Sequence, residues 1–395
     1  MANLLGLFMK KTLLCDANFC VLPLVDSILS KMHHLSVAGM IETDPAHKIA
    51  NNSVLIDYSN IDLLQKKIVE EGYDYIVPGC NDRSYFSLSK IAEKLGYPGF
   101  DKFETTLIIN YKDKFRSFAE SKGYPIPRSV NDLSEISSLQ FPILIKPIDS
   151  FSGKGIQKIF EKCDLTKEWE IAKKFSKEGG VIAEEFVDGK LYSHSAFIKD
   201  KKIVIDFFVN EYCTVYPYQV NSSNISDDLN FNIQSDLKEW VEKFSQDLDL
   251  VDGLIHTQFI SNGTNFYLIE VTRRCPGDLY SKLIEMSTGI NYAELYTLPF
   301  IGEKLPTKIE RKFTKFISRH TVSTDQDSIF LSSSVDIDNC GVLNIQLKTS
   351  GQKMLAAPFD KSGIYFIEFK NAVEMQKNTE NLKNYITIQK LTPQG

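Results

Sequence analysis

Short apolar runs alternate with helical patterns over the first hundred residues, and this alternation constrains the fold more than any other feature of the chain. It extends from Lys11 to about Gly99, with strands expected at 12–14, 36–41, 54–56 and 75–77 and helices at 21–31 and 62–70. Strands that alternate with helices form a parallel sheet covered by helices. The sequence therefore predicts a Rossmann-like domain, although no G-x-G-x-x-G fingerprint of dinucleotide binding follows the first strand.

Composition excludes several classes of protein. The chain has 395 residues, a formal net charge of −6 and 43% hydrophobic residues, so we expect about two to four packed units. The absence of a basic stripe argues against nucleic acid as a partner. The sequence has no run of 18 apolar residues, so we expect no membrane-spanning helix. The apolar patch Leu4–Met9 is followed by two lysines, an order that favours a buried strand over a signal peptide. Seven scattered cysteines without a C-x-x-C pair favour the reducing cytoplasm.

The rest of the chain changes character twice. A basic amphipathic helix is expected at 110–122, followed by two strand signals around a glycine-rich turn. Further on we expect strands at 202–209, 255–260 and 266–271, with a helix near 236–248 and a hairpin turn at Ser261–Thr264. After Pro306 the pattern becomes rich in strands, at 313–317, 342–347 and 364–369.

The first candidate binding element is the strand that ends in Lys146, followed by the turn Ser150–Ile156. A lysine at the end of an apolar strand must direct its charge towards a polar group. Glycines in the turn allow close approach of backbone N–H groups, so strand and turn together make a phosphate cradle. A plain surface hairpin is the alternative interpretation.

The second candidate is Val181–Gly189, an apolar strand that runs into two carboxylates and two apolar residues. Its extended backbone can hydrogen-bond a planar base while Phe186 and Val187 form an apolar slot. The alternative is an edge strand with a solvated acidic end.

The third candidate is the hairpin that carries Gln258 on one strand and Glu270 on the next. Glu270, Thr272 and Arg274 share one face of an extended strand. Oxygen ligands with few carboxylates suit Mg²⁺ bound jointly with nucleotide phosphates, and a nearby arginine suits charge that develops on a transferring phosphoryl group. A surface ion pair is the alternative.

Weaker candidates lie near these segments. Asp82 and Arg83 follow a strand that ends in Pro-Gly, where ligands gather in open α/β sheets. His256 shares a strand face with Gln258, and Tyr216 lies in an aromatic-polar loop that can recognise a substrate. A structural histidine and a packed loop are the alternatives.

The order of these features resembles the ATP-grasp superfamily, and within it the carboxylate–amine ligases related to D-alanine–D-alanine ligase, biotin carboxylase and carbamoyl phosphate synthetase. The resemblance implies an α/β with α+β chain: a Rossmann-like pre-ATP-grasp domain (1–109), a split ATP-grasp domain (110–305) and a small β-rich C-terminal domain (306–395). The ATP-grasp domain would divide into a nucleotide lid (110–190) with a flap at 150–155 and a larger subdomain with the metal site (191–305).

The resemblance also implies site residues. Catalytic roles would fall to Arg274 and Lys146. The ligands of Mg²⁺, or of Mn²⁺ in its place, would be Gln258, Glu270 and Thr272. The residues implied for ATP are Lys114, Lys146, Ser152, Gly153, Lys154, Gly155, Glu184, Glu185, Phe186 and Val187. Those implied for the substrate are Asp82, Arg83, Tyr216, His256, Gly277 and Asp278.

Three positions depart from the family pattern. Glutamate is frequent where Gln258 stands, asparagine is usual where Thr272 stands, and an acidic residue that binds ribose is common near Leu191.

The implied function is an ATP-dependent ligase that joins a small carboxylate to an amine through an acyl-phosphate. Assembly as a homodimer is compatible with this function. A carboxylase or carbamoyl-phosphate-type enzyme that uses bicarbonate, and a non-catalytic ATP-binding module, are the alternatives.

Overall fold

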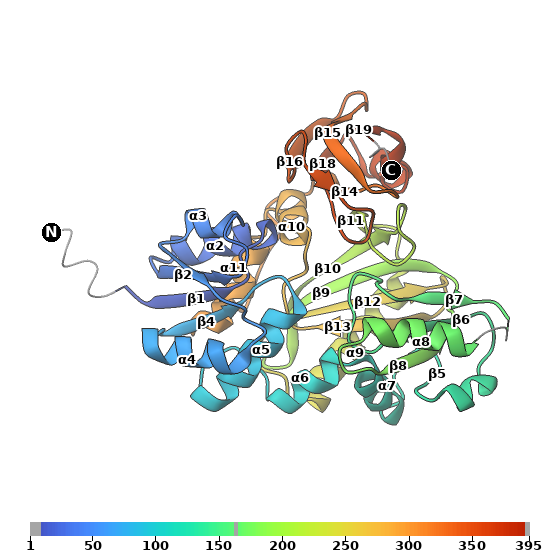
Figure 1. Ribbon diagram of the computed structural model, residues 1–395, viewed down its shortest axis with the longest axis horizontal. Coiled ribbons are helices and arrows are strands. Elements are labelled where there is room, and N and C mark those ends of the chain that lie inside the picture. The colour runs from blue at the N-terminus through green and yellow to red at the C-terminus, as the bar shows by residue number, and fades with distance from the viewer. Residues whose placement is uncertain (1–8, 162–164, 392–395) are drawn as a thin grey trace.

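The computed structural model describes residues 9–161 and 165–391. No helix within these ranges is both long and apolar enough to cross a membrane, and the cysteines that they contain are free thiols. The strand predicted over Leu4–Met9 lies almost wholly outside the described residues. Figure 1 shows the N-terminal part of the chain, residues 129–185 and the C-terminal part as separate lobes.

The first lobe is built on a parallel sheet of order β3-β2-β1-β4. Its strands are β1 (Lys11–Cys15), β2 (His34–Gly39), β3 (Asn52–Leu55) and β4 (Tyr75–Pro78), and its helices are η1 (Phe19–Val21), α2 (Leu22–Ser30), α3 (Ala46–Ile49), α4 (Ile61–Glu71) and α5 (Asp82–Leu95). Leu13 and Leu14 point to opposite faces of β1 and are both fully buried, because helices cover both faces of a parallel sheet. The Rossmann-like prediction is confirmed.

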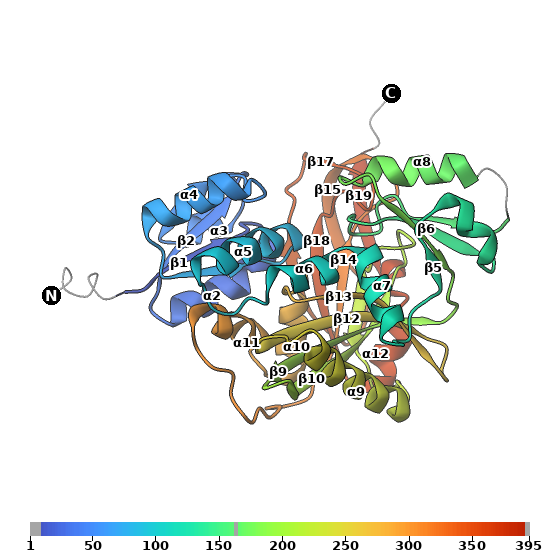
Figure 2. The same ribbon diagram turned by 90° about the horizontal axis from the view of Figure 1, so that it is seen from below.

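The second lobe, which we call the lid after the expectation from the sequence, has an antiparallel sheet of order β5-β8-β6-β7. It contains β5 (Ser129–Val130), η2 (Leu133–Ser138), β6 (Ile143–Pro147), β7 (Gln157–Ile159), α8 (Leu165–Phe175) and β8 (Val181–Glu185), and it is reached through α6 (Phe103–Asn110) and α7 (Lys112–Ser121). The lid has a small apolar core of its own, which includes Ile143, Ala172 and Ala183. Figure 2 shows the lid and the first lobe on opposite sides of β12 and β13.

An eight-stranded sheet of order β13-β12-β9-β10-β11-β14-β18-β16 runs through the centre of the molecule. Its first five strands are β9 (Lys190–Lys199), β10 (Lys202–Tyr212), β11 (Ser222–Ile225), β12 (Gly253–Ser261) and β13 (Phe266–Thr272), and the associated helices are α9 (Phe231–Asp247), α10 (Tyr280–Thr288), α11 (Tyr292–Thr297) and η3 (Leu298–Ile301). One apolar core joins this sheet to the first lobe: it includes Leu14, Val77, Phe207 and Tyr292. The first lobe is therefore fixed to the central sheet.

The last part of the chain completes this sheet and adds a small second one. It contains β14 (Phe316–Val322), β15 (Ser328–Val335), β16 (Gly341–Gln346), β17 (Lys353–Met354), β18 (Gly363–Phe369), α12 (Ala372–Thr379), η4 (Leu382–Asn384) and β19 (Ile386–Leu391). The strand predicted at 313–317 begins at Phe316, three residues later than expected. Strands β15 and β19 were not predicted, because their serines and other polar residues make the apolar signal weak.

Candidate functional site

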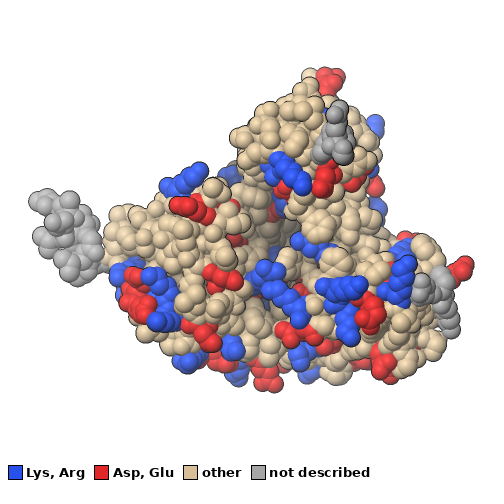
Figure 3. All heavy atoms as spheres, viewed as in Figure 1, with Lys and Arg blue, Asp and Glu red and all other residues tan. Residues whose placement is uncertain are grey.

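A pocket lies where distant parts of the chain meet: the start of α5, the junction of α6 and α7, the turn after β6 and the end of β13. Its lining includes Asp82, Tyr85, Thr106, Asn110, Lys112, Ser150, Phe151, Glu270 and Thr272. Lys and Arg side chains gather around the hollow in the middle of the molecule (Figure 3). A concavity with converging polar groups is the first place to look for a binding site.

A buried ionic cluster joins the lid to this pocket. Lys146 Nζ lies 2.5 Å from Glu184 Oε2, and Arg116 Nη2 lies 3.0 Å from Glu184 Oε1. Arg116 Nη2 also donates to the backbone oxygen of Ile269, which lines the pocket, at 2.9 Å. Arg116 thus bridges the lid strand β8 and the strand that carries Glu270.

The cluster is held together by charge against the cost of burial. Burial alone would raise the pKa of Glu184, but the charges of Arg116 and Lys146 outweigh burial and hold this pKa at about 2. Burial lowers the pKa of Lys146, and the attraction of Glu184 opposes this effect. A phosphate that approached Lys146 would meet a cation already freed of most of its water.

The glycine-rich turn packs against the rest of the protein. Gly153 has a φ of 70°, and a Cβ at this position would lie 2.6 Å from the backbone oxygen of Tyr218. Tyr216 Oη donates to the Gly153 oxygen at 3.4 Å, and Lys112 Nζ donates to the Ser150 oxygen at 2.7 Å. The turn of this β6–β7 hairpin is therefore held on one side by Tyr216 and Tyr218 and on the other by Lys112.

The acidic end of the lid strand β8 is buried at Glu184 and half-buried at Glu185. Strand β8 lies between β5 and β6, so the edge-strand alternative is wrong. Glu184 points inward and is 1% exposed, whereas the side chain of Glu185 accepts a hydrogen bond from the Gln140 N–H at 2.9 Å. The ammonium of Lys158 lies 3.2 Å from the centroid of the Phe186 ring.

The residues predicted to hold Mg²⁺ lie on adjacent strands. Gln258 of β12 is paired with Glu270 of β13, as the hairpin predicted, and Thr272 follows two residues along β13. The Gln258 amide donates from Nε2 to Glu211 Oε2 at 2.7 Å. An amide oxygen, a hydroxyl and a carboxylate are hard ligands that fit Mg²⁺, so the donor set suits the ion.

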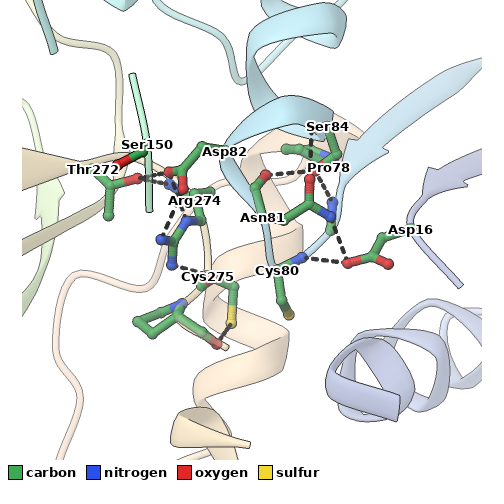
Figure 4. A network of polar contacts seen from close by, with 12 residues as sticks. Asp16, Pro78, Cys80, Asn81, Asp82, Ser84, Ser150, Thr272, Arg274 and Cys275 are labelled. Atoms are coloured by element: carbon green, nitrogen blue, oxygen red, sulfur yellow. Dashed lines mark hydrogen bonds and ion pairs between the residues drawn. The ribbon is translucent and has the colours of Figure 1, made fainter. Parts of the chain in front are cut away.

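Arg274 is held by the first lobe (Figure 4). Its Nε lies 2.9 Å from Asp82 Oδ1, and Nη2 lies 3.1 Å from Oδ2. Burial alone would raise the pKa of Asp82, but Arg274 lowers it below its usual value. The ion pair with Asp82 holds the Arg274 guanidinium near the end of β13, the strand that carries Glu270.

A second network fixes the position of Asp82. Asn81 caps α5 by accepting the Ser84 N–H at 3.0 Å, and it donates to Asp16 at 2.8 Å. Asp16 has a φ of 138°, a region that non-glycine residues rarely adopt. The end of β1 therefore supports the helix start that presents Asp82 (Figure 4).

Two of the predicted substrate residues, Gly277 and Asp278, lie against the last part of the chain. Arg319 Nη1 donates to the Asp278 backbone oxygen at 2.9 Å, and Lys361 forms an ion pair with the Asp278 carboxylate. Burial and then the charges of Arg83 and Lys361 lower the pKa of Lys154. Three cations thus stand close to one another: Arg83 of the first lobe, Lys154 of the lid and Lys361 of the last part of the chain.

The structure does not bring every predicted residue to the pocket. Lys114 is exposed on α7, and Lys112 lines the pocket instead. His256 is buried within the sheet, where its Nδ1 bonds Ser195 Oγ at 2.7 Å. Burial lowers the pKa of His256 well below 6.5. The ring is therefore neutral and forms part of the buried hydrogen-bond network with Ser195.

Sequence reasoning also missed Arg116 and Glu211. The i, i+4 spacing of Lys112 and Arg116 places both on one face of α7, a signal that separates them from Lys114. No comparable local signal exists for Glu211.

Residues 139–282 match the ATP-grasp domain family. A formate-dependent phosphoribosylglycinamide formyltransferase of Prochlorococcus marinus is 26% identical over 280 residues, which cover 67% of this chain and 69% of that protein.

Two solved structures share the fold over nearly the whole chain. A phosphoribosylglycinamide synthetase from Anaerococcus prevotii has a TM-score of 0.75 at 18% identity and covers 96% of this chain and 99% of its own. An L-amino acid ligase from Bacillus licheniformis has a TM-score of 0.77 at 17% identity and covers 97% and 99%.

Fold, site and matches together define a class, the ADP-forming ATP-grasp ligases, whose members use ATP with Mg²⁺. The chain contains an ATP-grasp domain over residues 139–282 and is an enzyme of this class.

Proposed function

We propose that the protein uses ATP to activate a small carboxylic acid as an acyl-phosphate and then joins the acid to an amine, forming an amide or peptide bond. The observation that carries the proposal is the pair of Arg274 and Asp82 at the end of the strand that holds Glu270. ATP binding alone needs no guanidinium at that place, whereas phosphoryl transfer to a carboxylate does.

The proposal assigns a role to each segment. Lys146, Lys112 and the flap residues Ser152–Gly155 would bind the ATP phosphates, with Lys112 in place of the Lys114 expected from the sequence. The backbone of residues 184–187 would hold the adenine. Gln258, Glu270 and Thr272 would hold Mg²⁺, which supplies neutralising charge for the phosphates when it is bound.

The chain's own residues can supply what the reaction needs. A carboxylate resists attack by an amine because its leaving group would be oxide, and phosphorylation provides a better leaving group. Arg274 and Lys146 would offset the repulsion between two anions brought together. The flap, clamped by Tyr216 and Tyr218, would exclude water and so protect the activated acid from hydrolysis.

The relatives narrow the acids worth testing. The Prochlorococcus relative is named for formate and phosphoribosylglycinamide, and the Bacillus structure for L-amino acids. We therefore place formate and amino acids first among the acids, and phosphoribosylglycinamide and amino acids first among the amines.

The test is ADP release from ATP and Mg²⁺ in the presence of paired acids and amines, with product analysis by mass spectrometry. We expect release that requires an acid, and a new amide when an amine is added. Release with bicarbonate alone would favour a carboxylase or carbamoyl-phosphate-type enzyme. ATP binding without release under any pairing would favour the non-catalytic module and refute the proposal.

A further inference from the structure

Glu211 is a buried carboxylate that the proposed roles leave unused. It lies on β10 and is 6% exposed, and its Oε2 accepts the hydrogen bond from Gln258 Nε2 at 2.7 Å. Burying a carboxylate is costly, so its neighbours should show what it serves. Its neighbours are the Ser193 hydroxyl, the charge of the buried Arg319 and the amide of Gln258, and among these Gln258 is the predicted ligand of Mg²⁺.

The sheet allows this contact because the strand between the two residues carries a small side chain. Strand β9 separates β10 from β12. Ser193 of β9 is paired with Gln258, whereas Leu191 of β9 is paired with Glu211, so the contact runs diagonally past Ser193. Two strand spacings amount to about 10 Å, a gap that two long side chains can span only over a small residue. Ser193 provides that space.

The hydrogen bond fixes which way the Gln258 amide faces. A primary amide has one donating and one accepting end, and the accepting end would be repelled by the carboxylate of Glu211. The NH₂ group therefore faces Glu211, and Oε1 is left free for the side of the paired residue Glu270. An amide oxygen directed in this way can ligate a cation, whereas the NH₂ group cannot.

Charge leads to the same conclusion. With glutamine at position 258, Glu270 is the one carboxylate among the three predicted ligands. Two cations lie near it: Lys112 lines the same pocket, and Arg274 is close enough to feel the charge of Glu270. A second negative charge near Gln258 would strengthen binding of a divalent cation. Glu211 stands one hydrogen bond away.

We propose that Glu211 is a positioning residue of the metal site: it orients the Gln258 amide oxygen towards the metal and supplies the negative charge that glutamine lacks. The inference rests on the proposed function, because it takes Gln258 and Glu270 as the ligands.

The test measures Mn²⁺ binding to the full-length protein with ADP, by electron paramagnetic resonance of free Mn²⁺. Glu211→Gln should weaken Mn²⁺ binding about 10- to 100-fold, the usual cost of losing a residue that supports a metal ligand. The double variant Glu211→Gln with Gln258→Glu moves the carboxylate to the ligand position itself and should restore most of the affinity. A merely structural role for Glu211 would not predict this rescue.

The matched control is Asp206→Asn. Asp206 lies on the same strand but on its other face, where its carboxylate contacts the side chains of His194 and Lys238. Mn²⁺ binding should therefore not change. Thermal unfolding without nucleotide checks the fold of each variant. Should Glu211→Gln fail to fold, the double variant is compared with the wild type directly, and wild-type-like affinity supports the proposal.

Unchanged Mn²⁺ affinity in Glu211→Gln would overturn the inference, as would a double variant that binds no better than the single one. The readout needs no turnover. Glu211-dependent Mn²⁺ binding in a protein that joins no acid to an amine would therefore refute the proposed reaction and leave this inference standing.

Discussion

Replacing Glu184 with glutamine should destabilise the lid by about 3 kcal/mol at pH 7. The pKa of this carboxyl falls from its usual 4.5 to about 2 on folding, and each pKa unit corresponds to about 1.4 kcal/mol. The change would also leave Lys146 and Arg116 as buried cations without a counter-charge, a loss for which about 3–5 kcal/mol is typical. Both figures describe the interaction of Glu184 with the same two cations, and they agree in magnitude.

The effect should depend on pH in a defined direction. Because the folded pKa lies below the unfolded one, the stabilisation is fully present above pH 4.5 and is lost as the pH falls towards 2. Between pH 7 and pH 3.5 the difference between wild type and Glu184→Gln should shrink by about 1 kcal/mol.

The assay is urea unfolding followed by tryptophan fluorescence. Trp169 packs against the lid core and Trp240 belongs to the core of the central sheet, so a Trp240→Phe background reports on the lid alone. Glu185→Gln is the control, since this neighbour lies on the other face of β8 and should cost less than about 1 kcal/mol. Equal stability of Glu184→Gln and Glu185→Gln, or a difference that does not shrink in acid, would refute the reasoning.

Three further substitutions test the proposed chemistry. Glu270→Gln should lower ADP formation about 100-fold or more with unchanged thermal stability, because a metal carboxylate is worth several kcal/mol; normal turnover would exclude Glu270 as a ligand. Arg274→Lys loses the two-point contact with Asp82 and should lower kcat about 100-fold while ADP affinity, measured by calorimetry, stays within about threefold; an unchanged kcat would remove Arg274 from the reaction. Gly153→Ala forces a Cβ against Tyr218 at positive φ and should raise the KM for ATP about tenfold; an unchanged KM would mean that the flap does not close on ATP.

The sequence predicted those parts of the fold that have a strong local pattern. The parallel sheet of the first lobe follows from buried runs such as Leu13 and Leu14, which are apolar on both faces. Strand β15 escaped prediction because its second half contains three consecutive serines, two of them exposed, and such a strand is specified by its partners rather than by its own residues.

The candidate site shows the same division. Gln258 and Glu270 could be paired from the sequence because a short hairpin joins them. The i, i+4 spacing groups Lys112 with Arg116 rather than with Lys114, but the contact of this face of α7 with the turn after β6 joins distant parts of the chain and does not follow from the local pattern. Glu211 lies 47 residues from Gln258 along the chain and meets it only because three strands lie side by side.

The continuity of the central sheet limits how this enzyme can be rebuilt. Strand β14 pairs directly with β11, with Ser223 opposite Arg319, and Ser223 is in turn paired with Glu211. A cut near residue 306 would bare the edge of β11 and invite aggregation. The segment after residue 306 therefore cannot simply be exchanged between relatives, because a grafted strand would have to form the same hydrogen bonds with β11. A misfit there would disturb the neighbouring strand β10, which carries Glu211 beside Gln258.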